Sequence, residues 1–560
     1  MLSPEAPADN AGSAQRTHPR IGRWLLTIYG LVALAFSIVP VTKYFTTGSL
    51  KDYRLWFNTG QIVAKGSPFF SEDDFTDLPG LVTKLAIHTD PVSQFLWNQF
   101  PPGGQLALTN SESTAADHQS ALVSALNDVL RGDSLDDPAR FAGVALSAGT
   151  LALRAKNPAS ADRTWLNRLL IEDACPSLVA KRPPHSGELY PKTGEFPFMY
   201  PPFAAAVLAP LSGGGQLFLI IVLVAVNSAA WLAAVLLSVY LITGRALRQH
   251  PGLYFWPSLG CVAFVWSTYF LGQCNLLLLA LMLGAFACLR LGRSVPAGLL
   301  IALAAGIKAF PIMAVGYLVY RKYWIALVSL AVSLVVFLLV IPACFRGIPG
   351  AKEDLRRWAN GMLFHYDKDT IAQRPDRAFT WKNQSLIAVA NRFLRHVSSD
   401  DSGPGPNYVN IADLPFKVIN GIVLFVALGL CLFYVFAMPR GVPRIPSHAA
   451  MEYSMLLLLI LMFSPLSFGY FYVWLIFPLT LVLHMALTHP AGSRERTVAW
   501  SVFGLSLFFL TWAIPFPFLR VPRALGNNLL ACLTLFFCLG WALRRSAGSA
   551  VTKTPAPGMA

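Results

Sequence analysis

Charged residues are scarce in this chain. Only 13% of its 560 residues are Asp, Glu, Lys or Arg, whereas about 25% is usual in a soluble globular domain. Apolar residues make up 55%, and apolar runs long enough to cross a bilayer, which takes about 20 residues, recur along the chain. The composition therefore excludes a soluble domain and predicts an all-α polytopic membrane protein.

The sequence also lacks a soluble basic domain. Its net charge of +15 would otherwise suggest that the chain binds nucleic acid. Many of the Lys and Arg residues instead stand in short segments between apolar runs, where such residues set the orientation of membrane spans. We therefore expect membrane lipids as partners and no nucleic acid.

The Cys and His residues show no metal-binding spacing. Six of the eight Cys lie inside apolar runs, where they act as small apolar side chains. We therefore expect no metal and no cofactor. The first 20 residues are too polar, and the apolar run after them too long, for a cleaved signal peptide.

The distribution of basic residues predicts how the chain is threaded. Arg16, Arg20 and Arg23 flank the first apolar run, at about 21–44, which predicts a cytoplasmic N-terminus. We expect about 12 membrane segments, two large extracytoplasmic loops, both termini in the cytoplasm and a location in the cell inner membrane. The expected parts are a cytoplasmic tail (1–20), the first span and first-loop motif (21–70), an extracytoplasmic insertion (71–195), a membrane core (196–344), a second extracytoplasmic loop (345–414), C-terminal spans (415–545) and a cytoplasmic tail (546–560).

One apolar segment, at 295–320, has basic residues at both ends. Arg293 precedes it and Arg321 follows it, so a single straight span would violate the charge asymmetry. Its centre contains Lys308 and Pro311, and a proline breaks a helix. We therefore expect two short helices with a turn near Lys308, whose charge at membrane depth requires a polar cavity.

An acidic residue follows the first span. Asp52 stands beside Arg54 and several aromatic residues at the expected outer membrane face. A carboxylate in this position suits a general base that deprotonates an acceptor hydroxyl for attack on a sugar. The alternative is a solvated loop residue.

The second outer loop is rich in cations and amides. Arg side chains bind phosphate through their charge and fork geometry, and a Trp ring can lie against a sugar. The alternative is a loop that contacts anionic lipid headgroups. The candidates from this loop are Arg374, Arg377, Trp381, Asn383 and Gln384. Gln273 and Asn275 are further candidates from outside the loop, because polar side chains in an apolar segment face either a cavity or another helix.

Six short motifs occur in an order that resembles glycosyltransferase family 87, whose members include mannosyltransferases that use polyprenyl-phosphate-mannose. The resemblance covers about residues 24–543, apart from the insertion at 71–195. The motifs are Asp52-Tyr53-Arg54-Leu55-Trp56, Tyr200-Pro201-Pro202-Phe203, Gly272-Gln273-Cys274-Asn275, Gly306-Ile307-Lys308, Asn383-Gln384-Ser385-Leu386 with Arg392, and Ser464-Pro465-Leu466-Ser467.

The resemblance implies a helical bundle of the GT-C type with an outward cavity. It also implies inverting transfer of a sugar, with mannose first, from a polyprenyl-phosphate-sugar donor to a lipid or glycan acceptor on the extracytoplasmic face. Asp52 would be the general base. The implied donor-binding residues are Arg54, Lys308, Arg374, Arg377, Asn383, Gln384 and Arg392, and the implied cavity residues are Tyr200, Gln273, Asn275 and Trp381.

The chain departs from the family pattern after Ser467. The family often has Trp and then His there, whereas this chain has Phe468-Gly469-Tyr470-Phe471, so a contact that depends on that His is not expected. The insertion is also longer than expected. Two other functions stay open: a transporter or flippase of lipid-linked sugars, although only one broken helix pair is seen, and a non-catalytic membrane scaffold.

Overall fold

The computed structural model describes residues 20–46, 52–65, 189, 198–247, 249–366, 368, 371–372, 378–400, 407–439, 445–511 and 520–552. The regular elements within these ranges are helices, apart from one β-bridge between Tyr366 and Ile371. The prediction of an all-α protein is therefore confirmed for the part of the chain that is described. The insertion at 71–195, apart from Leu189, and the candidates Arg374 and Arg377 lie outside the described residues.

Within the described ranges, seven helical segments are long and apolar enough to cross a membrane, which confirms a multi-pass membrane protein. An eighth would be the pair α12 (Val262–Leu271) and α13 (Asn275–Arg290), which is bent by 119°. The seven are α1 (Arg20–Thr46), α10 (Gln216–Thr243), α16 (Trp324–Val335) continuing through η4 (Val336–Val340) into α17 (Ile341–Met362), α19 (Phe416–Ala437), α20 (Pro446–Phe463), η5 (Gly469–Leu475) with α21 (Ile476–Thr488), and α24 (Asn527–Thr552).

The other helices are shorter or more polar, so the count of 12 segments stays a prediction. The apolar segment at 252–271, for example, is divided at Cys261 into α11 and α12, just after Pro257 and Gly260. The remaining helices are α2 (Asp52–Lys65), α9 (Pro202–Ser212), α11 (Gly252–Gly260), α14 (Ser294–Ile307), η3 (Phe310–Met313), α15 (Ala314–Tyr320), α18 (Leu386–Leu394), α22 (Arg494–Thr511) and α23 (Arg520–Ala524).

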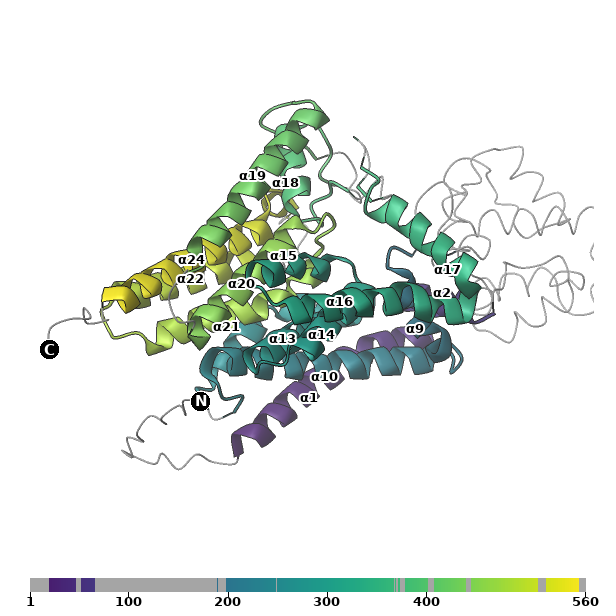
Figure 1. The fold of residues 1–560 in the computed structure, drawn as a ribbon, viewed down its shortest axis with the longest axis horizontal. Coiled ribbons are helices and arrows are strands. Elements are labelled where there is room, and N and C mark those ends of the chain that lie inside the picture. The colour runs from purple at the N-terminus through teal and green to yellow at the C-terminus, as the bar shows by residue number, and fades with distance from the viewer. Residues whose placement is uncertain are drawn as a thin grey trace, which may run out of the picture.

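The bundle has buried central helices and apolar outer ones. Nearly all side chains of α20 and α21 are buried, whereas α1, α16 and α19 expose large apolar side chains such as Leu34, Val328 and Phe425. In Figure 1 α1 lies along one edge of the bundle and α19 along the opposite edge. Large exposed apolar surfaces of this kind are what lipid tails cover in a membrane protein.

The segment around Lys308 turns back, as predicted. Lys308 ends α14 in an extended conformation, and η3 and α15 follow after Pro311. The start of the next helix, α16, lies beside the start of α14, since the Ser329 hydroxyl donates to the Val295 carbonyl at 2.8 Å. The chain therefore leaves and re-enters at the same end of the bundle, and Lys308 stands at the turn.

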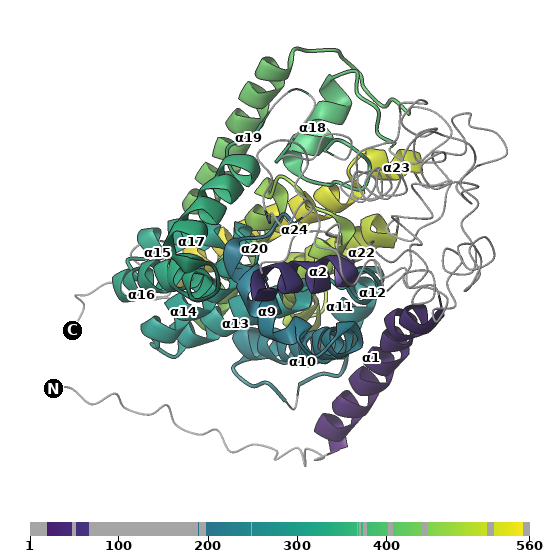
Figure 2. The same ribbon diagram turned by 90° about the vertical axis from the view of Figure 1, so that its right-hand side faces the viewer.

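Residues 52–56, which we placed in the loop after the first span, begin helix α2. This helix lies across one end of the bundle against α9, as the view in Figure 2 shows. Its Tyr53 ring occupies the space beside Gly272, which has φ +78°; a Cβ there would lie 2.8 Å from the ring. Only glycine suits both the left-handed conformation and this close approach.

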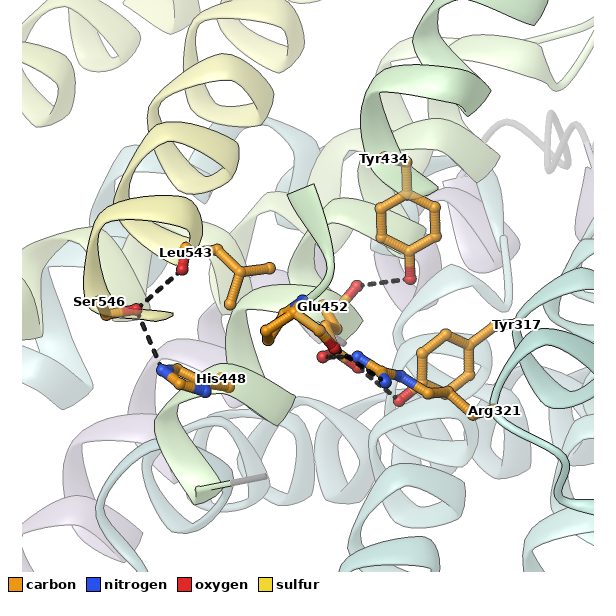
Figure 3. Close-up of polar contacts among 8 residues, drawn as sticks. Tyr317, Arg321, Tyr434, His448, Glu452, Leu543 and Ser546 are labelled. Carbon is orange, nitrogen blue, oxygen red and sulfur yellow. Dashed lines mark hydrogen bonds and ion pairs between the residues drawn. The ribbon is translucent and has the colours of Figure 1, made fainter. Parts of the chain in front are cut away.

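An ion pair joins α15 to the first half of α20. The Arg321 guanidinium donates to both carboxylate oxygens of Glu452, with the Nε contact at 3.1 Å, and the Tyr317 hydroxyl donates to the same carboxylate at 3.0 Å (Figure 3). Glu452 is fully buried. A buried carboxylate requires partners of this kind, so these contacts connect the returning helix to the centre of the bundle.

Candidate functional site

Four motif residues meet at the end of the bundle that α2 covers. The Gln273 side chain donates from its Nε2 atom to the Asp52 carboxylate. Its Oε1 atom accepts from the Lys308 ammonium at 2.6 Å and from the Tyr200 hydroxyl at 3.1 Å. A carboxylate and an ammonium are therefore linked through the two ends of one amide.

The ends of helices hold these side chains in place. Gln273 lies in the sharp turn between α12 and α13, where the Trp56 indole donates to the Gly272 carbonyl at 2.7 Å. Trp56 also stacks on Tyr200 with 4.4 Å between ring centroids. The start of α2 is thereby bound to the segment before α9 and to the α12–α13 turn.

Lys308 is buried among polar and aromatic groups. Its ammonium also donates to Asn275 Oδ1 at 3.2 Å, and it lies within about 5 Å of the ring centroids of Tyr200, Tyr470 and Phe471. Aromatic faces stabilise a cation electrostatically. This surrounding supplies the polar environment that we expected for a lysine at membrane depth.

A cavity of about 250 Å³ opens beside Lys308. Its walls come from the segment before α9, from η3, α17 and the end of α20, and from the segment that follows α20. Most of them are apolar, and the polar lining side chains among the described residues include Tyr200, Lys308 and Ser464. The cavity can therefore hold an apolar group with a charged or polar part directed toward the ammonium.

A second cavity, of about 390 Å³, adjoins the first at Phe468 and Tyr470, which line both cavities. Its lining is more polar and includes Trp381, Gln384, Arg523, Lys382, Asn527 and Asn528. The Arg523 guanidinium lies 4.8 Å from the centroid of the Trp381 ring. Burial lowers the pKa of Arg523 to about 10, so this group stays cationic at neutral pH.

The comparisons with known proteins found one family model and two relatives. The family model "Glycosyltransferase family 87" matches residues 198–465. The resemblance to family 87 is confirmed. No solved structure matches the chain.

Two relatives carry the same name, polyprenol-phosphate-mannose-dependent alpha-(1-2)-phosphatidylinositol pentamannoside mannosyltransferase. The chain is 28% identical to the Mycobacterium tuberculosis protein, over 59% of this chain and 70% of the relative. It is 29% identical to the Mycolicibacterium smegmatis protein, over 57% of this chain and 68% of the relative. The match to family 87 and these two relatives indicate a membrane glycosyltransferase.

The family 87 motifs that are distant in the sequence meet in the fold as two groups. The first is the group of Asp52, Tyr200, Gln273, Asn275 and Lys308 described above. In the second, the Asn383 amide donates to the Pro465 carbonyl at 2.9 Å and its Oδ1 accepts from the Ser467 amide at 3.0 Å. The Tyr472 hydroxyl donates to the Gln384 carbonyl at 3.0 Å, which joins this second group to the η5 segment.

Several predicted donor-binding residues have other surroundings. Arg392 is fully buried and donates to the backbone carbonyls of Ala524, Phe379, Thr380 and Asn383. Burial lowers its pKa to about 9, so at neutral pH Arg392 is still a cation, and it binds these backbone carbonyls. This geometry gives Arg392 a role in holding the loop, and we do not propose it further as a phosphate ligand.

Asn383 is also fully buried, and its side-chain amide donates to the backbone carbonyl of Ala378. The half-buried Arg54 on α2 is not among the residues that line either cavity. Gln384 and Trp381 line the second cavity rather than the one beside Lys308. The structure thus brings Tyr200 and Lys308 to the first cavity and Trp381 and Gln384 to the second, whereas Asn383 and Arg392 bind the backbone of the loop itself. No group of His, Cys, Asp and Glu in the described ranges could hold a metal ion.

Our sequence reasoning missed Arg523, Asn527 and Asn528. They lie within the predicted C-terminal spans (415–545), and none belongs to a motif that we recognised. Tyr470 and Phe471 appeared in the sequence only as a departure from the family pattern, and the structure places both rings beside the Lys308 ammonium. No local sequence pattern indicates this proximity, because the two rings lie more than 160 residues after Lys308 in the chain.

Proposed function

We propose that this chain is an inverting glycosyltransferase of the GT-C type that takes mannose from a polyprenol-phosphate-mannose donor. Two relatives are named as enzymes that depend on this donor, which supports the choice of sugar and carrier. The observation that carries the proposal is the chain of hydrogen bonds from Asp52 through Gln273 to Lys308 at the edge of a largely apolar cavity. The acceptor is a lipid or glycan that presents a hydroxyl group.

The proposed reaction forms one bond to the anomeric carbon and breaks another. The acceptor hydroxyl oxygen attacks this carbon, and the Asp52 carboxylate takes the hydroxyl proton. The bond between the anomeric carbon and the phosphate oxygen breaks, and polyprenyl phosphate leaves with the electron pair. Attack from the face opposite the leaving group inverts the configuration.

The surroundings of Lys308 suit the departing phosphate. The ammonium is buried, and a cation in a low-dielectric site stabilises developing negative charge more strongly than it would in water. The apolar walls of the first cavity, which include Trp358, Met362 and Phe463, suit the first isoprene units of the carrier. We therefore propose that the donor occupies this cavity.

The hydrogen bond from Gln273 to Asp52 supports the role of Asp52 as a base. Gln273 directs an N–H toward the carboxylate and so fixes the position of that carboxylate. It also keeps the carboxylate near the cation that would face the leaving group. We place this reaction on the extracytoplasmic face, because the basic residues between the spans predict that α2 lies there.

Substitution of Asp52 by Asn tests the proposal. The amide is nearly isosteric but cannot take a proton, so transfer of labelled mannose from polyprenol-phosphate-mannose should fall by about 10²- to 10⁴-fold. Donor binding, measured in the same membranes, should be retained. Asp413→Asn is the matched control, since Asp413 is exposed in the segment between α18 and α19 and should tolerate the change.

An Asp52→Asn variant that transfers mannose at the rate of the unmodified protein would remove Asp52 as the base. If neither protein transferred mannose but the unmodified chain moved labelled lipid-linked sugar across a vesicle membrane, the transporter alternative would replace the proposal. Absence of both activities in folded protein would favour the scaffold alternative.

A further inference from the structure

We infer that the second cavity is the acceptor site and that it recognises a sugar headgroup next to an anionic group such as a phosphate. This inference rests on the proposed function, which requires a second substrate beside the donor. It concerns the cavity of about 390 Å³ between α12, the segment 381–384, η5 and the start of α24.

The position of the second cavity fits an acceptor. Phe468 and Tyr470 line both cavities, so the two spaces adjoin at these two aromatic residues. Leu271 also lines the second cavity, and it is two residues before Gln273, whose side chain donates to the Asp52 carboxylate. The second cavity thus reaches the α12–α13 turn that carries Gln273, and Tyr200, which donates to the same Gln273 side chain, lines the first cavity.

The charge of the second cavity predicts an anionic ligand. Lys382 and Arg523 both line it, and the lining residues that the structure describes include no Asp or Glu. The Trp381 ring lies 4.8 Å from the Arg523 guanidinium and 5.6 Å from the Lys382 ammonium, which favours a defined position for both cations. A guanidinium held in one orientation suits the paired oxygens of a phosphate or carboxylate.

Neutral polar groups in the same cavity suit sugar hydroxyls. Gln384 Oε1, Asn527 Oδ1 and Trp381 Nε1 are buried and have no hydrogen-bond partner in the described part of the chain. Such atoms lose free energy unless a partner satisfies them. A hydroxyl group is both a donor and an acceptor, so the hydroxyls of a sugar ring could satisfy the two oxygens and the indole N–H together.

The first arm of the test measures transfer from polyprenol-phosphate-mannose to two acceptors. One is phosphatidylinositol mannoside, and the other is a mannosyl diacylglycerol, which carries the same sugar without phosphate. Arg523→Gln should raise the KM for the anionic acceptor by about 10- to 100-fold and leave the KM for the donor unchanged. The KM for the neutral acceptor should change little.

Two further variants separate recognition from folding. Arg523→Lys keeps the charge but loses the planar fork, so its KM for the anionic acceptor should lie between those of the unmodified protein and Arg523→Gln. Lys417→Gln removes an exposed cation at the start of α19 and should leave both KM values unchanged. Inorganic phosphate as a competitor distinguishes a site that binds phosphate alone from one that needs the whole headgroup.

If Arg523→Gln transfers mannose with the same KM for the anionic acceptor as the unmodified protein, the inference is overturned. The proposed function would still stand, because mannose transfer is retained. If no protein transferred mannose, the proposed function would fail. Thermal stabilisation of the detergent-solubilised protein by phosphatidylinositol mannoside would still decide the inference: stabilisation lost in Arg523→Gln supports the anion site, and equal stabilisation in both proteins rejects it.

Discussion

At the scale of single residues, Gln273 connects the groups that the proposed chemistry needs. Its amide has one end that donates and one that accepts, and the structure uses the first for the Asp52 carboxylate and the second for Lys308 and Tyr200. A Glu at this position would repel Asp52, and a Leu would bind neither group. The amide therefore keeps a carboxylate and an ammonium close without placing them in direct contact.

The buried Glu452 carboxylate provides a test of stability that is independent of catalysis. Glu452→Gln leaves the Arg321 guanidinium without its counter-ion in the interior, and breaking a buried pair in this way costs about 3–5 kcal/mol. We expect a clear loss of thermal stability in detergent, measured by the temperature of unfolding.

Glu353→Gln is the matched control for this change. Glu353 pairs with Arg356 and Arg357 within one helix, and its side chain is 38% exposed. Pairs exposed to solvent contribute about 0–1 kcal/mol, so this variant should unfold near the temperature of the unmodified protein. Equal losses in the two variants would show that the Arg321–Glu452 pair adds nothing beyond a surface contact.

The candidate site was only partly predictable at this scale. Motif resemblance identified Asp52, Tyr200, Gln273 and Lys308, and the structure brings these four together. The same reasoning grouped Arg392 with them, because an arginine in a sequence has the charge to bind phosphate whatever its surroundings. Four backbone carbonyls surround its guanidinium, and such contacts between distant segments leave no trace in a local sequence pattern.

At the scale of helices, the position of Lys308 depends on how closely α14 approaches α16. Gly298 of α14 faces the backbone of α16, and a Cβ at this position would lie 2.2 Å from the Ala326 carbonyl oxygen. α14 ends at Lys308, so a displacement of this helix also displaces the ammonium.

Gly298→Ala should therefore reduce both stability and mannose transfer. Forcing a methyl group into a filled helix contact costs about 1–3 kcal/mol, and the unfolding temperature should fall accordingly. Gly316→Ala in α15 is the control, since a Cβ there meets nothing within 4 Å. An unfolding temperature and a transfer rate that match those of Gly316→Ala would contradict the argument that this close approach positions α14.

Long apolar helices were more predictable than short ones. The C-terminal spans were predicted to begin at 415, and α19 begins at Phe416. The break at Lys308 was expected from Pro311 and the flanking cations. Helix α2 was not predicted, because a short helix with a mixed polar and apolar composition looks like a loop next to the long membrane runs. Its fold depends on packing against α9 and on the Tyr53 contact with Gly272.

At the scale of the whole molecule, the orientation in the membrane is still a prediction. We expect the segment around Ile411, between α18 and α19, on the outside and the segment around Leu247, between α10 and α11, in the cytoplasm. Both side chains are exposed, at 80% and 43%. The two positions can therefore report the side of the membrane without disturbing the packing.

Cysteine labelling measures this orientation. In a background with Cys175→Ser and Cys344→Ser, a membrane-impermeant maleimide should label Ile411→Cys in intact cells. It should label Leu247→Cys only after the membrane is opened. The opposite pattern would place Asp52 on the cytoplasmic side and would contradict extracytoplasmic transfer.

The sequence predicted the fold class of the whole molecule but not its number of membrane segments. Composition and apolar runs predicted a multi-pass helical protein, and seven helical segments meet the requirements of length and apolarity. The twelve expected segments included short helices such as α14, and charged ones such as α22, whose first turn contains Arg494, Glu495 and Arg496. Whether such helices cross the bilayer depends on their neighbours, which a window of sequence does not contain.

The contact between the two cavities at Phe468 and Tyr470 has a consequence for hydrolysis of the donor. Under the proposed assignment, water could reach the sugar through the acceptor cavity whenever that cavity is empty, and hydrolysis would then waste an activated lipid. A headgroup that fills the cavity excludes this water and supplies the competing hydroxyl at the same time. Whether the acceptor fills the second cavity would thus decide between transfer of the sugar to the acceptor and its hydrolysis.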